Sequence, residues 1–184
     1  VYRARTRERT QSMKLFGVAG WSGSGKTTLL RRLIPELVGR GLSVSTVKHA
    51  HHNFDVDQPG KDSYEHRKAG ATEVLVGSAS RWALMHELRG RREPSLDELV
   101  AHLSPVDLVL VEGFKRESHP KLEVYRRRVG KPPLYPEDPH VVAVASDQPI
   151  PGLELPRLEL DDVPAIADFV AAHCGLVGER EGVA

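Results

Sequence analysis

A glycine-rich octet near the N-terminus carries the clearest chemical signal in this chain. Residues Gly20–Thr27 read GWSGSGKT and fill every fixed position of the pattern G-x-x-x-x-G-K-[ST]. Glycines at these positions let the backbone turn tightly and direct its N–H groups at a phosphate, because no large side chain intervenes. In this pattern Lys26 reaches the β- and γ-phosphates, and the hydroxyl of Thr27 binds Mg²⁺. The octet therefore predicts a nucleotide-phosphate site that uses magnesium.

The segments on either side of the octet match what such a loop requires, a strand before it and a helix after it. Lys14–Ala19 is short and apolar, which predicts a buried strand. Thr28–Arg40 carries leucine, isoleucine and valine at helical spacing, and Gly41 then gives a stop signal. Pro35 removes one hydrogen bond from this helix, so we expect a kink there. A glycine-rich turn that binds nothing is the alternative, and the matching flanks favour the phosphate site.

The positive dipole end of the helix points at the same phosphates. The nucleotide-binding residues predicted here are Gly20, Ser22, Gly23, Ser24, Gly25, Lys26, Thr27 and Thr28.

A carboxylate follows a strongly apolar predicted strand further along the chain. Leu108–Val111 ends in Glu112, and a carboxylate that leaves a buried strand beside a phosphate loop is the Walker B arrangement. Glu112 is predicted to hold Mg²⁺, directly or through a water, opposite Thr27. Asp107 lies at the other end of the same strand, which should place it too far away. The alternative is that Glu112 only begins a polar loop. The predicted catalytic residues are Lys26, Thr27 and Glu112.

Asp62 is a further candidate for the metal. It precedes a short predicted helix over residues 62–70, where its first expected role is that of the N-cap. A second role near Mg²⁺ stays open. A basic stretch after Glu112 either faces a phosphorylated substrate or forms ordinary solvated surface. Its members are Lys115, Arg116, Lys121 and residues 126–128.

The segment that follows the second predicted strand, over residues 42–47, is rich in histidine and aspartate. Residues 48–57 read KHAHHNFDVD, a composition that could bind a transition metal. Three histidines within four residues cannot all face one ion in a regular segment, however. Because ligands of parallel sheets lie at the carboxyl ends of strands, we assign Lys48 and His49 to the nucleotide or substrate cleft. His51 and His52 are read equally well as part of a solvated loop.

A possible base-recognition residue follows the strand predicted over residues 141–145. This strand ends in Ser146 and Asp147. An aspartate carboxylate accepts two hydrogen bonds from guanine N1–H and its 2-amino group, and adenine offers no such pair. Ser146 and Asp147 are therefore predicted to bind the nucleotide and to select GTP. The usual N/T-K-x-D guanine motif is absent from the sequence, and a simple turn over residues 147–149 is the alternative.

Short apolar runs alternate with helical patterns along the chain, which predicts an α/β fold with a mainly parallel central sheet in three layers. Further strands are predicted over residues 72–76, 81–86, 106–111 and 122–127. Further helices are predicted after the capping box Ser95–Glu98 and after Asp161 and Asp162.

Length and composition limit the function classes. The chain has 184 residues, enough for one domain, which we place at residues 13–175. We take residues 1–12 as a disordered or non-native extension and residues 176–184 as a flexible tail. The 26 basic residues nearly balance 25 acidic ones, which argues against general nucleic-acid binding. A single cysteine and no long apolar run predict a cytoplasmic protein that does not enter a membrane.

Several segments together resemble one known family, that of the molybdopterin-guanine dinucleotide biosynthesis adaptor, MobB. The segments are GWSGSGKTTLLRRLIPEL, TVKHAHHNFDVDQPGKDS, AGA at 69–71, DLVLVEGFK and VVAVASD, and the resemblance spans about residues 13–175. It implies a P-loop protein that binds Mg²⁺ and GTP and hydrolyses GTP slowly at most. It also implies a homodimer that works with a MobA-type guanylyltransferase, the enzyme that joins GMP to molybdopterin.

Two other function classes stay open. A small-molecule or nucleotide kinase would use the same loop, and residues 89–92 could supply its arginine-rich lid. A GTP-dependent metallochaperone would use the histidines at 49–52.

Overall fold

The computed structural model describes residues 13–50 and 54–176. The predicted extension at 1–12, His51 and His52, and nearly all of the predicted tail lie outside the described residues. The chain divides into two compact units, which are described separately below. The larger comprises Val1–His49 and Leu99–Ala184, and the smaller comprises Ala50–Glu98. The prediction that residues 13–175 form one domain stays a prediction.

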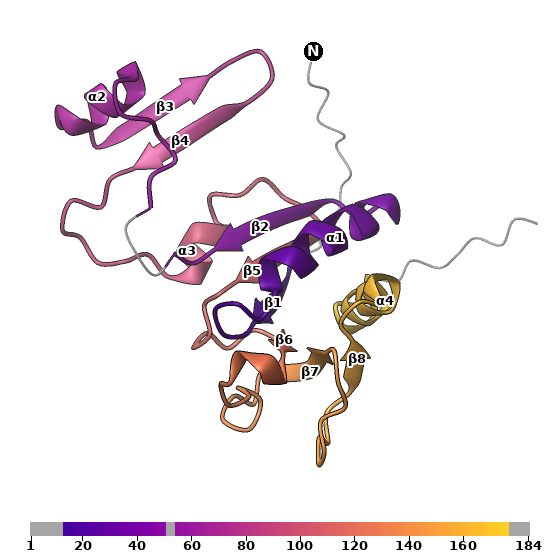
Figure 1. Cartoon of the computed structure of the whole chain (residues 1–184). Coiled ribbons are helices and arrows are strands. Elements are labelled where there is room, and N and C mark those ends of the chain that lie inside the picture. The colour runs from indigo at the N-terminus through magenta and orange to yellow at the C-terminus, as the bar shows by residue number, and fades with distance from the viewer. Residues whose placement is uncertain (1–12, 51–53, 177–184) are drawn as a thin grey trace, which may run out of the picture. The chain divides into compact units, whose positions relative to one another are not determined.

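The larger unit is built on a parallel sheet, as the alternation of strands and helices predicts. Its strands are β1 (Lys14–Ala19), β2 (Val44–Lys48), β5 (Leu108–Glu112), β6 (Lys121–Tyr125), β7 (Val141–Ser146) and β8 (Arg157–Glu159). They follow the order β2-β5-β1-β6-β7-β8, and every neighbouring pair is parallel (Figure 1). The carboxyl ends of β2, β5, β1, β6 and β7 therefore lie along one edge, where ligands of parallel sheets bind.

Register places particular residues side by side at this edge. Glu112 is the Cα partner of both Lys48 on β2 and Val18 on β1. On the other flank of β1, Ala19 pairs with Glu123 of β6. The loop that leaves β1 thus begins between the ends of β5 and β6, so residues that follow those two strands are its neighbours.

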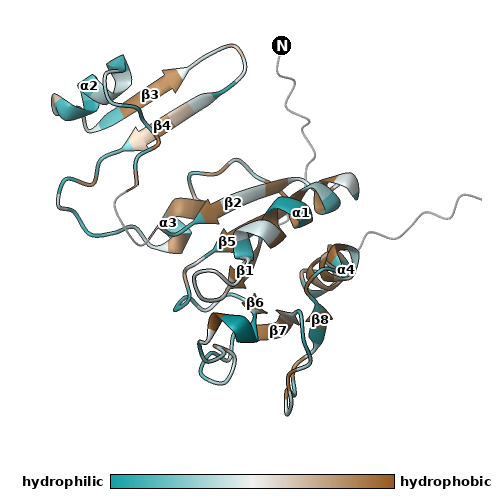
Figure 2. Cartoon of the chain, in the orientation of Figure 1, coloured by the Kyte–Doolittle hydropathy of each residue, from teal (hydrophilic) through white to brown (hydrophobic). Residues whose placement is uncertain are grey.

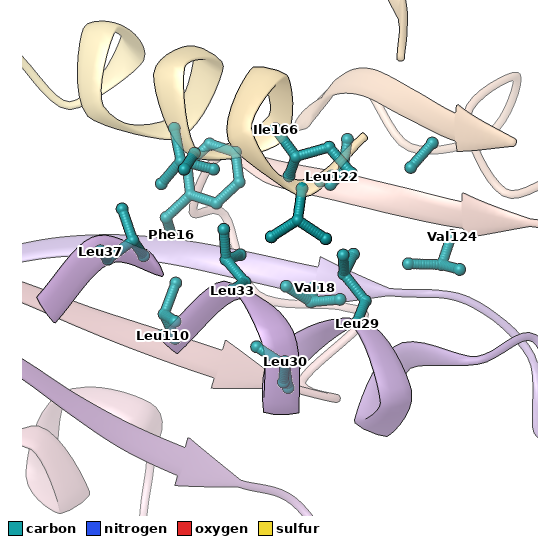
Figure 3. Packing of buried hydrophobic residues seen from close by; sticks show 14 of the residues in the cluster. Phe16, Val18, Leu29, Leu30, Leu33, Leu37, Leu110, Leu122, Val124 and Ile166 are labelled. Carbon is teal, nitrogen blue, oxygen red and sulfur yellow. The ribbon is translucent and has the colours of Figure 1, made fainter. Parts of the chain in front are cut away.

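Two helices cover one face of the sheet, α1 (Lys26–Gly39) and α4 (Val163–His173). The four leucines of the predicted apolar face of α1 are buried and point at the sheet residues, whereas Val38 of that predicted face is exposed (Figure 3). The core cluster contains Phe16, Val18, Leu29, Leu30, Leu33, Leu37, Leu110, Leu122, Val124 and Ile166 among its members. α1 continues through Pro35 to Gly39 without interruption. At the start of α4, Asp162 accepts a hydrogen bond from the Ala165 N–H at 3.1 Å, which confirms the predicted helix start.

The smaller unit contains α2 (Asp62–Lys68) and an antiparallel hairpin of β3 (Glu73–Gly77) and β4 (Trp82–His86). Arg67 holds these parts together, since its guanidinium donates to Asp55 at 2.7 Å and to Glu87 at 3.0 Å. Short helix α3 (Leu96–Val100) follows. The predicted capping box is confirmed, because the Glu98 N–H donates to Ser95 Oγ at 3.2 Å and the Ser95 N–H donates to Glu98 Oε2 at 2.8 Å.

The observed elements differ from the predicted ones in two respects. Each predicted strand and helix is present, with ends that shift by a few residues. Strand β8 and the 3₁₀ turn η1 (Arg127–Val129) were not predicted, since each has three residues and is rich in charge. Such short segments give no measurable periodicity.

Replacement of Leu33 by alanine tests the α1–sheet core. Leu33 is fully buried, so Leu33→Ala should lower the free energy of unfolding by about 2–5 kcal/mol. Val38, on the same helix, is 52% exposed, and Val38→Ala should change that free energy by less than about 0.5 kcal/mol. Urea titration followed by circular dichroism measures both. Equal losses in the two variants would contradict the packing described here.

Candidate nucleotide-binding site

The octet forms the strand–loop–helix unit that the sequence predicts. β1 ends at Ala19, and α1 begins at Lys26 with Gly25 as its N-cap. Gly25 has φ +104° and Gly23 has φ +81°, values that L-residues with side chains rarely adopt. The backbone N–H groups of the first helical turn are therefore left at the carboxyl edge of the sheet, where an anion can accept from them.

Gly20 fixes this loop against the neighbouring strand. A Cβ atom at Gly20 would lie 2.5 Å from the carbonyl oxygen of Val124 on β6 and 2.8 Å from Ser24 Oγ. Its φ of +140° also favours glycine. Only a residue without a side chain allows the loop to approach β6 this closely, so the first glycine of the motif sets the position of the whole loop.

Lys26 extends over the loop rather than away from it. Its Nζ donates to the carbonyl oxygens of Gly20 and Trp21, both at 2.9 Å. Burial lowers the pKa of the Lys26 ammonium, and the negative charge of Glu112 partly opposes that effect. A cation held in this way would be placed to contact phosphates bound in the loop.

Thr27 and Glu112 meet as predicted. Thr27 Oγ1 donates to Glu112 Oε1 at 3.0 Å, and the Nζ of Lys48 lies 3.8 Å from Oε2. A hydroxyl and a carboxylate beside a phosphate site are ligands that suit Mg²⁺. The donor set therefore fits the predicted metal, and Glu112 does more than begin a polar loop.

His49 lies beside the same strand end. Its backbone N–H donates to the carbonyl of Glu112 at 2.9 Å, and its ring centroid lies 4.8 Å from that of Phe114. A Cβ at Gly113 would lie 2.9 Å from His49 Cβ, so the turn after β5 needs a glycine there. Lys48 and His49, the two predicted cleft residues, are thus both next to Glu112. In the part of the chain that the structure describes, no group of three or more metal-ligating side chains occurs.

Ser146 is the last residue of β7, and Asp147 follows it. Ser146 Oγ donates to the carbonyl of Gln148 at 2.8 Å, which forms the turn considered as the alternative. The carboxylate of Asp147 takes no part in that hydrogen bond and accepts from Arg126 Nη1 at 3.3 Å. The turn and a base-binding role are therefore compatible.

Arg126 is the site residue that sequence reasoning missed. It follows β6 directly, and a Cβ at Gly25 would lie 3.6 Å from its Nε, so its guanidinium packs against the phosphate loop. The sequence placed it only in a basic stretch. The sequence signal was its position at the end of a predicted strand; that this strand pairs with β1 is known from the structure.

Two other members of the basic stretch lie in different places, Lys115 at the rim of the loop and Lys121 in the interior. Lys115 Nζ lies 4.3 Å from the ring centroid of Trp21, and Trp21 Nε1 donates to the carbonyl of Pro132 at 2.7 Å. Lys121 corrects the prediction, because it is fully buried and faces neither substrate nor solvent. Its Nζ donates to the carbonyl of Glu117 at 2.7 Å and to Asp138 at 2.8 Å.

Asp62 also corrects a prediction. The N-cap of α2 is Lys61, and Asp62 is the first helical residue, where its negative charge still suits the helix dipole. It lies in the smaller unit, and its predicted metal role stays a prediction. Ser22 and Thr28, two other predicted nucleotide-binding residues, are exposed at the loop.

Comparison with known proteins identifies the family. The family model described as "Molybdopterin guanine dinucleotide synthesis protein B" matches residues 15–147. This chain belongs to the MobB family. The Escherichia coli (strain K12) protein named molybdopterin-guanine dinucleotide biosynthesis adapter protein is 49% identical over 159 residues, which cover 85% of this chain and 90% of the relative. The Haemophilus influenzae protein of the same name is 47% identical, with coverage of 85% and 86%.

A solved structure of Bacillus subtilis MobB shares the fold. It superposes with a TM-score of 0.70 at 26% identity and covers 87% of this chain and 97% of that chain. The predicted α/β fold of the P-loop type, with a parallel central sheet, is thus confirmed. In the described residues, no helix is both long enough and apolar enough to cross a membrane.

Substitution of Gly20 tests the close approach of the loop to β6. Gly20→Ala should disorder the phosphate loop, because its Cβ would meet the Val124 carbonyl at 2.5 Å. Gly39→Ala is the matched control, since a Cβ there meets nothing within 4 Å and alanine favours helices. Hydrogen exchange of the amides at 20–27 should rise at least tenfold in the first variant only. Equal protection in both variants would rule out the contact as the fixing element.

Proposed function

We propose that this protein binds Mg²⁺ and GTP in the loop at Gly20–Thr27 and acts as an adaptor in the formation of molybdopterin guanine dinucleotide. The observation that carries the proposal is the Thr27–Glu112 pair at 3.0 Å beside Lys26, because it joins a phosphate-binding cation to a magnesium-binding donor set. The adapter role is the printed name of relatives that match most of the chain.

Each residue of the loop would have a distinct task. The backbone N–H groups and Lys26 would stabilise charge on the β- and γ-phosphates, and Thr27 and Glu112 would hold the metal, which neutralises phosphate charge when bound. Glu112 is engaged by Thr27 and lies near Lys48, an arrangement that suits a metal ligand better than a general base. We therefore propose at most a slow phosphoanhydride hydrolysis, with water attacking the γ-phosphate in line.

The proposed partners are a MobA-type guanylyltransferase and molybdopterin, and the proposed location is the cytoplasm. Lys115 and Lys131 form a cationic rim beside the loop, and this rim supports the proposal of an anionic partner. Lys115 and Lys131 both lie over Trp21, at 4.3 and 5.9 Å from its ring centroid. Together they offer positive charge and an aromatic ring at one place.

We also propose that the protein is a homodimer that uses the hairpin of the smaller unit. Leu75 on β3 pairs across the hairpin with Leu84 on β4, and Gly77 pairs with Trp82. These positions share one face of the hairpin, and Leu75 and Trp82 are 65% and 67% exposed. Figure 2 shows the apolar colouring of β3. An apolar face of this kind on a small antiparallel hairpin is suited to burial against a second copy.

Titration calorimetry tests nucleotide binding. The wild-type protein should bind GTP with Mg²⁺ more tightly than it binds ATP. Lys26→Ala should lower the affinity for GTP at least tenfold, because an ion–phosphate contact is worth about 1.5–3 kcal/mol. Lys14→Ala, at the amino end of β1, is the control and should bind as wild type. Unchanged GTP affinity in a folded Lys26→Ala protein would remove the phosphate assignment.

The same protein separates the alternatives to the adaptor. Label from [γ-³²P]GTP that appears on a small acceptor rather than in inorganic phosphate would favour a kinase. Stoichiometric Ni²⁺ or Zn²⁺ in protein purified without a tag would favour a metallochaperone.

Sedimentation velocity tests the dimer. Leu75→Asn should shift the protein toward monomer by at least tenfold in dissociation constant, because it places an amide on the apolar hairpin face. Val38→Asn, at an exposed apolar position on α1, is the control and should sediment as wild type. A wild-type protein that sediments as a monomer at 100 times the assay concentration would refute the proposal.

A further inference from the structure

Arg126 lies between the two subsites that a nucleotide would occupy. Its Nη1 is 3.3 Å from Asp147 Oδ2, at the candidate base subsite. Its Nε and Nη2 would lie 3.6 and 3.7 Å from a Cβ at Gly25, so the same guanidinium also contacts the phosphate loop. One side chain therefore touches both Asp147, which would recognise the base, and Gly25, the N-cap of α1.

The polar groups at the phosphate end are not satisfied by the protein. Among the described residues, Arg126 Nε and Ser24 Oγ are buried and have no hydrogen-bond partner. Ser24 is 2% exposed and belongs to the loop itself. Buried donors of this kind are unfavourable unless a partner is supplied, and a phosphate oxygen would accept from both.

The contact at the base end limits what Asp147 can do. Guanine N1–H and the 2-amino group together need both oxygens of one carboxylate. Arg126 Nη1 already donates to Oδ2. Oδ2 has a second lone pair, but the bond from Arg126 makes this oxygen a weaker acceptor. Guanine therefore binds the carboxylate more strongly once Arg126 has released it. The pair is suited to release, because it is a single contact of 3.3 Å and not a bidentate fork.

We propose that Arg126 exchanges partners when nucleotide binds, and so links phosphate binding to base recognition. In the free protein its guanidinium donates a hydrogen bond to the carboxylate of Asp147. Phosphates in the loop attract the guanidinium, which leaves both oxygens of Asp147 available to guanine. This inference rests on the proposed function, since it takes the loop to be the GTP site. Arg126 is then a specificity-determining residue, and guanine recognition becomes strong only after the phosphates are bound.

Such a link is reciprocal, so it can be measured with separate ligands. Inorganic tripolyphosphate occupies the phosphate subsite without a base, and guanosine occupies the base subsite without phosphates. In the wild-type protein, saturating tripolyphosphate with Mg²⁺ should raise guanosine affinity at least fivefold. Equilibrium dialysis with labelled guanosine gives that ratio.

Two variants then change guanosine binding in opposite directions. Arg126→Gln should bind guanosine more tightly than wild type, should bind tripolyphosphate at least tenfold more weakly, and should lose the effect of tripolyphosphate on guanosine. Asp147→Asn should lose guanosine binding and retain tripolyphosphate binding at wild-type strength or better. Arg127→Gln is the matched control, because Arg127 is the exposed neighbour in η1, and it should reproduce every wild-type value.

The outcomes separate this inference from the function on which it rests. A wild-type protein that binds neither tripolyphosphate nor GTP overturns both. GTP binding with no effect of tripolyphosphate on guanosine overturns the exchange and leaves the GTP site intact. Weaker guanosine binding in Arg126→Gln also overturns it. If Arg126→Gln melts below the assay temperature, Asp147→Asn decides the matter, and loss of its tripolyphosphate binding counts against the exchange.

Discussion

The approach of Gly20 to the carbonyl of Val124 is the contact on which the site depends. It brings the loop after β1 against β6, and no residue with a Cβ could replace Gly20 there without moving one of them. Arg126 stands two residues beyond Val124, so the same contact brings its guanidinium to Gly25. On the other flank, parallel pairing of β1 with β5 aligns Val18 with Glu112 and carries the carboxylate to Thr27. The loop is therefore fixed from both neighbouring strands.

Buried charges hold the segments that surround this edge. Lys121 is fully buried on β6, and its ammonium donates to backbone carbonyls of the turn after β5 and to Asp138. Glu123, two residues on, accepts from the N–H groups of Leu134 and Tyr135, while burial raises the pKa of its carboxyl group. Both side chains therefore connect irregular segments of the chain to β6. Those segments carry Lys115 and Lys131, which lie over Trp21. The buried side chains of Lys121 and Glu123 thus help to set the position of the cationic rim.

Local signals in the sequence were sufficient to predict the loop, but they were insufficient to predict the residues that surround it. The octet and the apolar run before Glu112 predicted the Thr27–Glu112 pair, because motif and strand end are both read within a few residues. The prediction that Lys121 faces substrate or solvent was wrong because lysine is rarely buried. Its partner Asp138 is 17 residues away in the sequence, and no local pattern indicates that the two side chains meet. Asp62 was given the N-cap on residue type alone, whereas the chain enters α2 one residue earlier. The position of Arg126 beside the loop depends on which strand is the neighbour of β1, and residue spacing in the sequence does not indicate the order of strands in a sheet.

The charges at the carboxyl edge are arranged in pairs that a nucleotide could exchange. Glu112 lies between the hydroxyl of Thr27 and the ammonium of Lys48, and Asp147 accepts from Arg126. Among the described residues, Lys26 has no such carboxylate within bonding distance; it donates to loop carbonyls, in a setting where burial lowers its pKa. Phosphates would offer the cationic side chains, and a divalent cation would offer Glu112, a stronger partner than the present one, because charge-assisted bonds to phosphate are short and the ion is doubly charged. The free protein therefore keeps Lys48 and Arg126 near neutralising carboxylates, and the difference between these modest pairs and stronger ones with ligand would be the free energy available for binding.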